Sequence, residues 1–436
     1  MPIAAIPRYL GQDFKEASPG MRFGMYLKLW GMNNRSSEAL WKTYDINYRV
    51  AGRGREEREF NDENKVNTLK DAQMLTTADR LRMKAVLDRQ QAAFVATALP
   101  HASLQLSAQS TAPFTTGLGN EHPLENGFAF LNPYGLPYLP GSGIKGVLRQ
   151  AARELASGEW GDTHDWSAGK TIEITIEKKH VQISIIDVLF GLESKDGEKE
   201  HLRGALTFWD VIPQIKGDHL AVEIMTPHQS HYYQQKREMK SGDSTSPHDS
   251  GSPNPISFLT VPPESGFTFF ITCNTALLAR HAPQMVDDEC WKNLLQTAFA
   301  HAFEWLGFGA KTAVGYGAMQ IDQKALQVQK EAEEKAKADA AREQMTETQR
   351  CITDYVAYME KRHEALQGKP TRMGAEYQET SKFSQKALTS TDWSAEDKRS
   401  AAEAMLEWLP KVVQVDMKNE RKKLKISQLL DNPPAS

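Results

Sequence analysis

The sequence predicts an α+β protein whose central domain has a ferredoxin-like (RRM-like) fold. Three observations lead to this class. Leu104, Leu106 and Ala108 alternate with polar residues, which predicts a half-buried strand over 103–110. Apolar residues at helical spacing predict helices after Pro140 and over 291–306. Further strands are predicted at 171–177, 181–186, 205–211, 267–272 and 314–321. The order β-α-β-β-α-β is that of a ferredoxin-like domain.

Changes in composition divide the chain into three parts. Residues 1–100 form an N-terminal extension that is irregular at first and then helical, with Leu75, Ala78, Leu81, Ala85, Phe94 and Val95 predicted on one face of a helix over 69–98. Residues 101–322 form the central domain. Residues 323–436 form a helical C-terminal extension, in which Ser394 is predicted to cap a helix that stops at Pro410.

The polar stretch 226–264 interrupts the central domain and is rich in Ser, Gly, Pro and His. A loop of this length within a compact domain is usually functional or disordered. We expect it to form a thumb that lies across a binding partner.

Composition excludes several classes of protein. No apolar run approaches ~18 residues, so no membrane span and no membrane partner are expected. Cys273, Cys290 and Cys351 lie far apart, which predicts neither a zinc site nor a disulfide framework and fits a cytoplasmic location. The formal net charge of −4 is unlike that of an autonomous nucleic-acid binder, so any RNA site would be a local basic groove.

A glycine-rich segment, residues 307–317, is the most informative stretch of the sequence: GFGAKTAVGYG. Glycines such as Gly309 permit positive φ and close backbone approach, and successive free N–H groups form an anion site. Lys311 adds a charge, Thr312 a hydroxyl and Tyr316 an aromatic face, which together suit single-stranded nucleic acid. An ordinary turn before a strand is the alternative. The order of residues excludes a Walker loop.

A second glycine cluster opens the helix after Pro140, in the segment PYLPGSGIKGVLR over 137–149. Ser142 is the predicted N-cap, followed by Gly143. Lys145 and Arg149 are four residues apart and are predicted to share the solvent-facing side. A helix N-terminus beside two cations suits a phosphate. The alternative is a capped surface helix with ordinary charges.

These segments resemble motifs of the RAMP superfamily of CRISPR RNA-binding proteins. Residues 137–149 are similar to its P-x-x-P-G-S-x-x-K-G-x-x-R segment, and 307–317 to its C-terminal glycine-rich loop. Between them, Leu189-Phe190-Gly191 and residues 203–210 are similar to its F-G … G-x-L-x-x-x-D signature. The resemblance implies a ferredoxin-like domain with a thumb insertion.

Two more segments resemble one branch of that superfamily, the sixth subunits of type III-B (Cmr) CRISPR effectors. They are residues 116–125 and the middle region around 226–233 and 253–261. The resemblance spans roughly 103–321. It implies a non-catalytic subunit of an antiviral ribonucleoprotein that holds the guide (crRNA) near its 3′ end. The implied partners are guide and target RNA, other RAMP subunits and small helical subunits.

The alternative function is a RAMP-type ribonuclease, metal-dependent or metal-independent. Related cleaving subunits carry an aspartate in the loop after the first strand, whereas here that loop has none and offers Glu121, His122 and Glu125. His228 is a second candidate for acid–base chemistry. The His228, His231, His248 and Asp249 set lacks regular metal-ligand spacing, so neither a metal nor a cofactor is expected.

Non-catalytic RNA contact is the preferred role for the histidines and tyrosines. Clustered His and Tyr side chains on a polar loop can stack on bases or cap the loop's own backbone. The predicted RNA-binding residues are Ser142, Gly143, Lys145, Arg149, Gly309, Lys311, Thr312, Tyr316, His122, His228, His231 and Tyr232.

Overall fold

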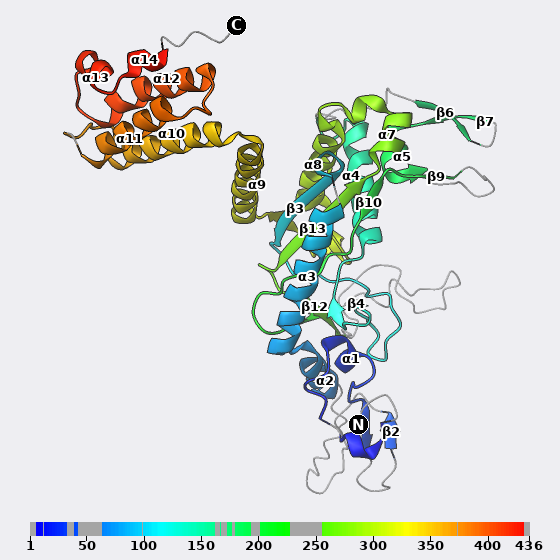
Figure 1. Cartoon of the computed structure of the whole chain (residues 1–436). Helices are drawn as coiled ribbons and strands as arrows, with labels where there is room; N and C mark the ends of the chain where they lie inside the picture. Colours follow the sequence, from blue (N-terminus) through cyan, green and yellow to red (C-terminus); the bar gives the residue numbers. More distant parts are fainter. Residues whose placement is uncertain are drawn as a thin grey trace, which may run out of the picture. The chain divides into compact units, whose positions relative to one another are not determined.

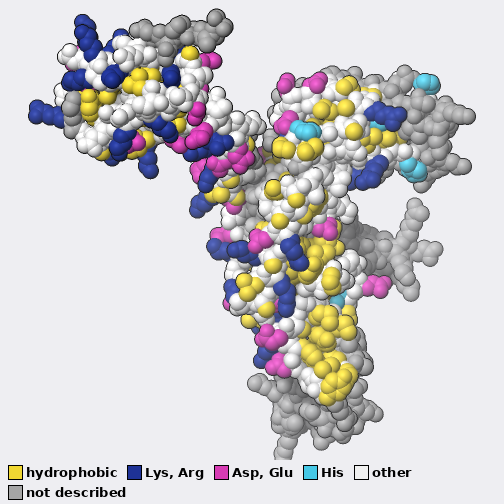
Figure 2. All heavy atoms as spheres, in the orientation of Figure 1, with side chains coloured by type: hydrophobic (Ala, Val, Ile, Leu, Met, Phe, Trp, Pro, Cys, Tyr) yellow, Lys and Arg dark blue, Asp and Glu magenta, His cyan; other side chains and the backbone are white. Residues whose placement is uncertain are grey.

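Figure 1 draws the computed structural model of the chain, which describes residues 6–11, 13–32, 39–41, 63–97, 99–161, 166, 172–176, 179–192, 201–226, 255–372 and 374–430. The chain forms two compact units, residues 1–326 and 327–436. Charged side chains of both signs are spread over the surface of both units (Figure 2). The predicted thumb, 226–264, lies mostly outside the described residues.

The first unit is built on a four-stranded antiparallel sheet with the order β10-β13-β3-β14. The strands are β3 (Ser103–Ser110), β10 (Leu206–Phe208), β13 (Gly266–Cys273) and β14 (Met319–Ile321). Counted along the chain this order is 2-3-1-4, the ferredoxin-like arrangement that the sequence predicts. The central strands pair from Gly266↔Gln109 to Thr272↔Ser103, whereas each edge strand pairs over only three residues.

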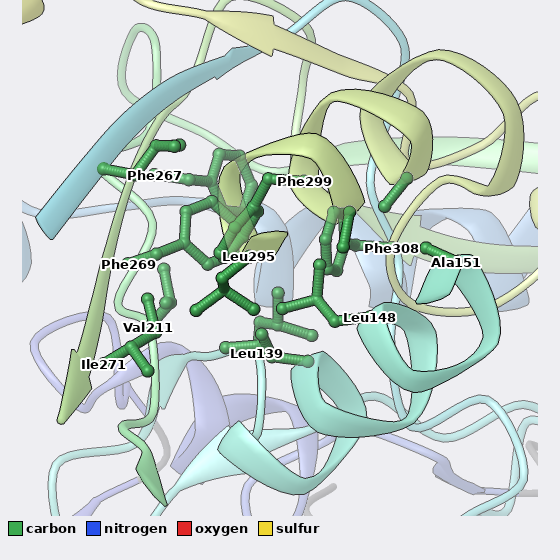
Figure 3. Close-up of a cluster of buried hydrophobic side chains, with 14 of the residues drawn as sticks. Leu139, Leu148, Ala151, Val211, Phe267, Phe269, Ile271, Leu295, Phe299 and Phe308 are labelled. Atoms are coloured by element: carbon green, nitrogen blue, oxygen red, sulfur yellow. The ribbon is translucent and has the colours of Figure 1, made fainter. Parts of the chain in front are cut away.

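One face of the sheet carries α4 (Gly141–Ser157) and α8 (Cys290–His301), and α8 continues as a π-helical turn, η5 (Ala302–Leu306). Alternate residues of β13 point into this layer. The Phe269 ring lies 5.1 Å from Phe299 and 5.4 Å from Phe308, between centroids. Figure 3 shows these rings converging with Leu148 of α4. Burying such a side chain contributes about 1.5–3 kcal/mol, so this layer is the main core of the unit.

The other face of the sheet is covered by α3 (Thr77–Thr97), which follows α2 (Glu63–Gln73). Phe94 packs 5.0 Å from Phe270, between ring centroids, and Gln91 Nε2 donates to Gln105 Oε1 at 2.8 Å. The helix thus covers the middle of this face, where Phe270 is buried, whereas Gln105 and Thr268 are half-buried and Thr207 and Gln320 are exposed. It leaves less open sheet surface for RNA than an uncovered RRM-like sheet has.

The single helix predicted over 69–98 is wrong in two respects. It is broken at 74–76, because Thr76 and Asp79 cap the start of α3 reciprocally: the Asp79 N–H donates to Thr76 Oγ1, and the Thr76 N–H donates to Asp79 Oδ2. The predicted apolar face is also wrong, since Ala78, Leu81, Ala85 and Val95 are exposed. The inner face of α3 consists instead of Asp79, Met83, Val86 and Phe94.

Two predicted strands have different bounds in the structure. The strand predicted at 181–186 is β7 (Lys179–Ile183), paired with β6 (Ile172–Ile176), and Ser184 then caps α5 (Ile185–Phe190). The strand predicted at 314–321 begins only at Met319, because η6 (Thr312–Val314) is a 3-10 turn and Gly315 and Gly317 have positive φ.

Short elements complete the first unit. The hairpins are β1 (Trp30–Met32) with β2 (Ala39–Trp41), β4 (Phe130–Leu131) with β5 (Leu136–Pro137), β8 (Gly191–Leu192) with β9 (Leu202–Arg203), and β11 (Ala221–Met225) with β12 (Ile256–Thr260). The short helices are η1 (Arg8–Leu10), α1 (Pro19–Phe23), η2 (Pro100–Ala102), α7 (Thr275–His281), η3 (Pro283–Met285) and η4 (Asp287–Glu289).

The second unit is helical and has its own core. Its helices are α9 (Gln323–Gln344), which begins in the first unit, α10 (Glu347–Ala365), α11 (Ala375–Thr389), α12 (Ala395–Val412), α13 (Met417–Lys423) and α14 (Ile426–Leu430). Tyr355 stacks on Phe383 with ring centroids 4.2 Å apart. The predicted Ser394 cap of α12 is confirmed, but the helix runs past Pro410 to Val412.

The three-part division at residues 100 and 322 stays a prediction of the sequence. Phe23, Leu27, Leu29 and Leu69, from the N-terminal extension, belong to the same buried cluster as the sheet. Among the described helices, none is both long and apolar enough to cross a membrane.

The start of α4 is capped across the fold rather than locally. Pro140 stands at the N-cap and Ser142 is exposed, so the predicted Ser142 cap is wrong. Instead, the Gly141 N–H donates to Asp210 Oδ1 at 2.7 Å. A carboxylate at this position also interacts favourably with the helix dipole.

We therefore expect Asp210→Ala to lower the free energy of unfolding by about 1–2 kcal/mol, the cost of losing a cap. Ser142→Ala, the matched control, should change it by less than about 0.5 kcal/mol, as for other exposed positions. Urea denaturation measures both. Equal losses in the two variants would contradict the cross-fold cap.

Candidate nucleic-acid interface

Most of the predicted site lies along one border of the sheet, where the strand ends meet their loops. This border is called the edge of the sheet below and is distinct from the edge strands β10 and β14. β3 and β10 end at this edge, β13 and β14 begin there, and the register Met319↔Ser110 and Gly266↔Gln109 aligns them. Because α4 begins beside Asp210, just after β10, its N-terminus lies at the same edge. The glycine-rich loop, 307–317, enters β14 from this edge.

The glycine-rich loop is held by close backbone contacts that only glycine permits. Gly309 has φ +93°, and a Cβ there would lie 2.2 Å from Thr115 O. Gly317 has φ +73°, and its Cβ would lie 1.9 Å from Phe308 O. The approach allows two backbone hydrogen bonds of 2.8 Å, from the Ala310 N–H to Thr115 O and from the Gly317 N–H to Pro113 O.

Several N–H groups of the same loop are left available. Those of Gly309, Lys311, Thr312 and Ala313 donate to no acceptor in the described part of the chain. Gly309 and Ala313 are exposed, and Lys311 and Thr312 half-buried. Consecutive free N–H groups in a turn of this kind form an anion-binding concavity.

Lys311 stands in this concavity with φ +60°. Its Nζ lies 5.3 Å from the centroid of the Phe258 ring and 3.0 Å from Met225 Sδ, on the hairpin β11–β12. No carboxylate pairs with it among the described residues. The charge is thus positioned by an aromatic face and remains able to meet an anion.

Tyr316 packs on the same ring, with its centroid 5.8 Å from that of Phe258. Burial raises the pKa of Tyr316, and the nearby Glu223 carboxylate adds to the increase. The phenol is therefore neutral at physiological pH and can donate a hydrogen bond. Phe258 thus joins Lys311 and Tyr316 into one mixed cationic and aromatic surface.

The α4 segment contributes less than predicted. Ser142 and Gly143 are exposed at the helix start, and Lys145 is half-buried. Arg149, predicted on the solvent-facing side, is largely buried instead, and its Nη2 lies 3.5 Å from Asp187 Oδ1 on α5. The Asp210 carboxylate also occupies the N–H of Gly141, so an anion here would have to bind the following turn.

His122 has a structural environment. Its ring stacks on Phe23 with centroids 3.9 Å apart, Nδ1 accepts from the Leu124 N–H at 3.2 Å, and Nε2 lies 3.0 Å from Phe23 O. Since Nδ1 must accept, Nε2 carries the proton and donates it to that carbonyl. Burial lowers the pKa of His122. Both ring nitrogens are occupied in the neutral form, which leaves neither for RNA nor for proton transfer.

Three predicted residues, His228, His231 and Tyr232, lie outside the described residues. Two described residues that flank them, Met225 and Ile256, pair with each other at the end of the hairpin β11–β12. That hairpin carries Phe258 and Met225 beside Lys311. No group of three metal-ligating side chains occurs within the described ranges.

Sequence reasoning assigned neither Phe258 nor Met225 to the site, and it met Asp210 only as the last residue of the G-x-L-x-x-x-D signature. Met225 directly precedes the predicted thumb and Phe258 lies near its end, on the paired strands β11 and β12, so the final part of the predicted thumb is a strand. Asp210 follows the predicted strand 205–211, but nothing in the local sequence connects it to Gly141, 69 residues away.

The chain is similar in sequence to known proteins. A sequence model described as the RAMP superfamily matches residues 108–320. This part of the chain is therefore similar to the RAMP superfamily. The match begins in β3 and ends in β14, so it covers the ferredoxin-like domain from first strand to last.

A curated relative, the CRISPR system Cmr subunit Cmr6 of Pyrococcus furiosus, is 30% identical over 241 residues. These cover 46% of this chain and 63% of the relative, so the match spans less than two thirds of the relative's length. Over this stretch the chain thus resembles a sixth subunit of Cmr complexes.

Two solved structures are also similar. The crystal structure of Cmr6 from Pyrococcus furiosus aligns with a TM-score of 0.27 and 26% identity, covering 51% of this chain and 99% of that one. A chain of the cryo-EM structure of the type III-B Cmr-beta bound to cognate target RNA aligns with a TM-score of 0.37 and 17% identity, covering 59% and 71%. The fold assignment stands on the strand order of the sheet.

The buried, neutral His122 predicts an acid-sensitive fold. Because its folded pKa is lowered, the unfolded chain takes up a proton first as the pH falls through about 6.5. The contribution of neutral His122 is therefore complete above that pH and is lost as the pH falls toward the folded pKa. Wild type should lose more stability between about pH 7.5 and 5.5 than His122→Gln does.

Urea titrations at both pH values measure this difference. The exposed His101 serves as the control, because His101→Gln should keep the wild-type pH dependence. An identical pH dependence for wild type and His122→Gln would contradict the assignment.

Proposed function

We propose that this protein is a non-catalytic RNA-binding subunit of a type III-B (Cmr) CRISPR ribonucleoprotein, which holds the guide RNA near its 3′ end and caps the backbone filament in antiviral defence. The position at the guide's 3′ end comes from the resemblance to the sixth Cmr subunits. The proposed partners are guide and target RNA and other Cmr subunits, in the cytoplasm.

The observation that carries RNA binding is the concavity of the glycine-rich loop. Four unoccupied N–H groups surround Lys311, whose ammonium has no carboxylate partner in the described residues. A phosphate could meet both the N–H groups and the charge, and the half-buried Tyr316, which packs on the buried Phe258 ring, offers an aromatic face beside it. Lys145 and the exposed Ser142 and Gly143 would extend this surface along the same sheet edge.

The geometry supports an edge-binding mode. With α3 packed on one face of the sheet and α4 and α8 on the other, RNA would follow the loops at the strand ends. His228, His231 and Tyr232 are proposed to contact the same RNA, because they follow closely in sequence on Met225, whose Sδ lies 3.0 Å from Lys311 Nζ.

A non-catalytic role is supported by the surroundings of the candidate acid–base groups. The Glu121/His122 alternative needs a histidine that can exchange a proton with RNA. Both nitrogens of His122 are already bonded to backbone groups, and its ring is stacked on Phe23. No observation favours the ribonuclease over the binding subunit.

Replacing Lys311 tests the proposal. Lys311→Ala should weaken binding of a single-stranded guide RNA by about 1–3 kcal/mol, the range for charge-assisted contacts. The slope of log K against log salt should fall by about 0.7 to 1 for the lost phosphate contact. Fluorescence anisotropy over a range of salt concentrations measures both.

The control is Lys84→Ala, which removes an exposed lysine from α3, on the covered face of the sheet. It should leave the affinity and the salt slope at their wild-type values. If Lys311→Ala and Lys84→Ala bind RNA alike, the glycine-rich loop is not the RNA site.

A further inference from the structure

The second unit carries a row of cations that the ferredoxin-like domain does not account for. Between Asp416 and Lys425 the sequence has five cationic side chains and two carboxylates. Lys418, Arg421 and Lys422 occupy positions i, i+3 and i+4 of α13, and Lys425 follows at i+7. Lys418, Arg421 and Lys422 therefore share one face of α13 over about 6 Å, and Lys425 lies two residues beyond the end of the helix. All four side chains are exposed.

The opposite face of α13 is buried against α11. Glu420 is 3% exposed and accepts hydrogen bonds from Tyr377 and from Lys423, the latter at 2.8 Å. Ser384 donates to the carbonyl of the buried Leu424. The packing fixes which side of the helix faces solvent. Of the five cations in this segment, Lys423 is the one that forms an ion pair with Glu420 among the described residues.

The four cations of the row have no counter-charge. None of them forms an ion pair with any residue that the structure describes. The second carboxylate, Asp416, is engaged as the N-cap and accepts from the Lys418 N–H at 3.0 Å. Dark blue Lys and Arg side chains are prominent on the visible face of this unit (Figure 2).

Helix stability accounts for only part of the row. Cations in the last turn, here Arg421 and Lys422, interact favourably with the helix dipole. Lys418 sits in the first turn, where the dipole disfavours a positive charge, and Lys425 lies beyond the helix with φ +50°. The row therefore continues past the positions that the dipole would select.

The residue types on this face of α13 indicate which class of partner it can bind. A protein interface would need apolar or aromatic anchors at its centre. Here the exposed residues of α13 are Lys418, Asn419, Arg421, Lys422 and Lys423, none of them apolar. A linear row of cations without anchors matches a binding mode driven by neutralising phosphates and releasing their counterions.

We propose that Lys418, Arg421, Lys422 and Lys425 form a second RNA-binding surface, which holds the phosphodiester backbone without reading its sequence. This inference rests on the proposal that the chain binds RNA, but it assigns a separate site on the helical unit. RNA held at the glycine-rich loop would gain affinity from a second contact on the same chain.

The test compares two fourfold variants of the full-length chain. K418Q/R421Q/K422Q/K425Q removes the row. K330Q/K335Q/K361Q/K369Q is the matched control, because it removes four exposed lysines of the same unit that form no ion pair with described residues. The probe is a fluorescent uridine homopolymer, titrated at several salt concentrations.

The row variant should bind at least about tenfold more weakly at low salt, and its salt slope should fall by about 2–3, at roughly 0.7 per lost phosphate contact. The control should stay within about twofold of wild type. Equal losses in both variants would overturn the proposal, since only total charge would then matter. Should the row variant fail to fold, K418Q/K422Q serves instead, with about half the loss in slope.

Two further arms separate this site from its alternatives. If the row variant loses affinity for polyglutamate but keeps its affinity for RNA, the partner is an acidic protein and the proposal fails. Lys311→Ala tests the first site independently. If Lys311→Ala weakens RNA binding and the row variant does not, the second surface is refuted while the proposed function stands. If the row variant weakens RNA binding and Lys311→Ala does not, only the glycine-rich loop is refuted as the RNA site.

Discussion

Pro113, Phe114 and Thr115, shortly after the first strand of the sheet, support both the glycine-rich loop and the hairpin β11–β12. On one side their carbonyls accept from Ala310 and Gly317 of the glycine-rich loop. On the other side Phe114 exchanges two backbone hydrogen bonds with Val261, and the Thr115 hydroxyl donates to Leu259 O at 3.0 Å. Thr115 and Phe114 are fully buried, so both sets of bonds are shielded from water.

This segment explains how a turn that is mostly glycine can present a defined surface. Glycine costs more backbone entropy on ordering than any other residue. Here the loop is anchored at Ala310 and Gly317, on either side of Lys311, which leaves only a short stretch between the anchors. The hairpin β11–β12 is fixed to the same three residues, so Phe258 and Lys311 are positioned relative to one another by a shared support.

Much of the fold could be predicted from the sequence, because its decisive signals are local. The alternation in 103–110 and the helical spacing after Pro140 follow from neighbouring residues, and they sufficed to obtain the strand order. The errors concern contacts between distant segments. Val314 is apolar and was assigned to a strand, but the positive φ of Gly315 and Gly317 delays β14. The predicted apolar face of α3 is right at Phe94, which packs on Phe270, but Met83 and Val86 complete the inner face in place of Leu81 and Ala85.

The candidate site was predictable in its composition more than in its geometry. Lys311 and Tyr316 do lie together, on a ring that only the structure reveals, Phe258. Arg149 and His122 have the residue types of a binding site, but Asp187 and the backbone of Phe23 and Leu124 occupy them. Whether a polar side chain is free depends on partners that are remote in sequence, and periodicity contains no information about them.

The shortness of the edge strands limits how this domain could pair with any other chain. β10 and β14 each pair over three residues, so either margin of the sheet has little unpaired backbone to extend into a sheet shared with another chain. Backbone pairing between two strands depends little on the identity of their side chains, so a long edge strand can pair with many different strands. A domain without that option would recognise any partner chain through side chains on loops and helices. Single substitutions can change such contacts one at a time. Closely related complexes could therefore diverge until the subunits of one no longer fit the other.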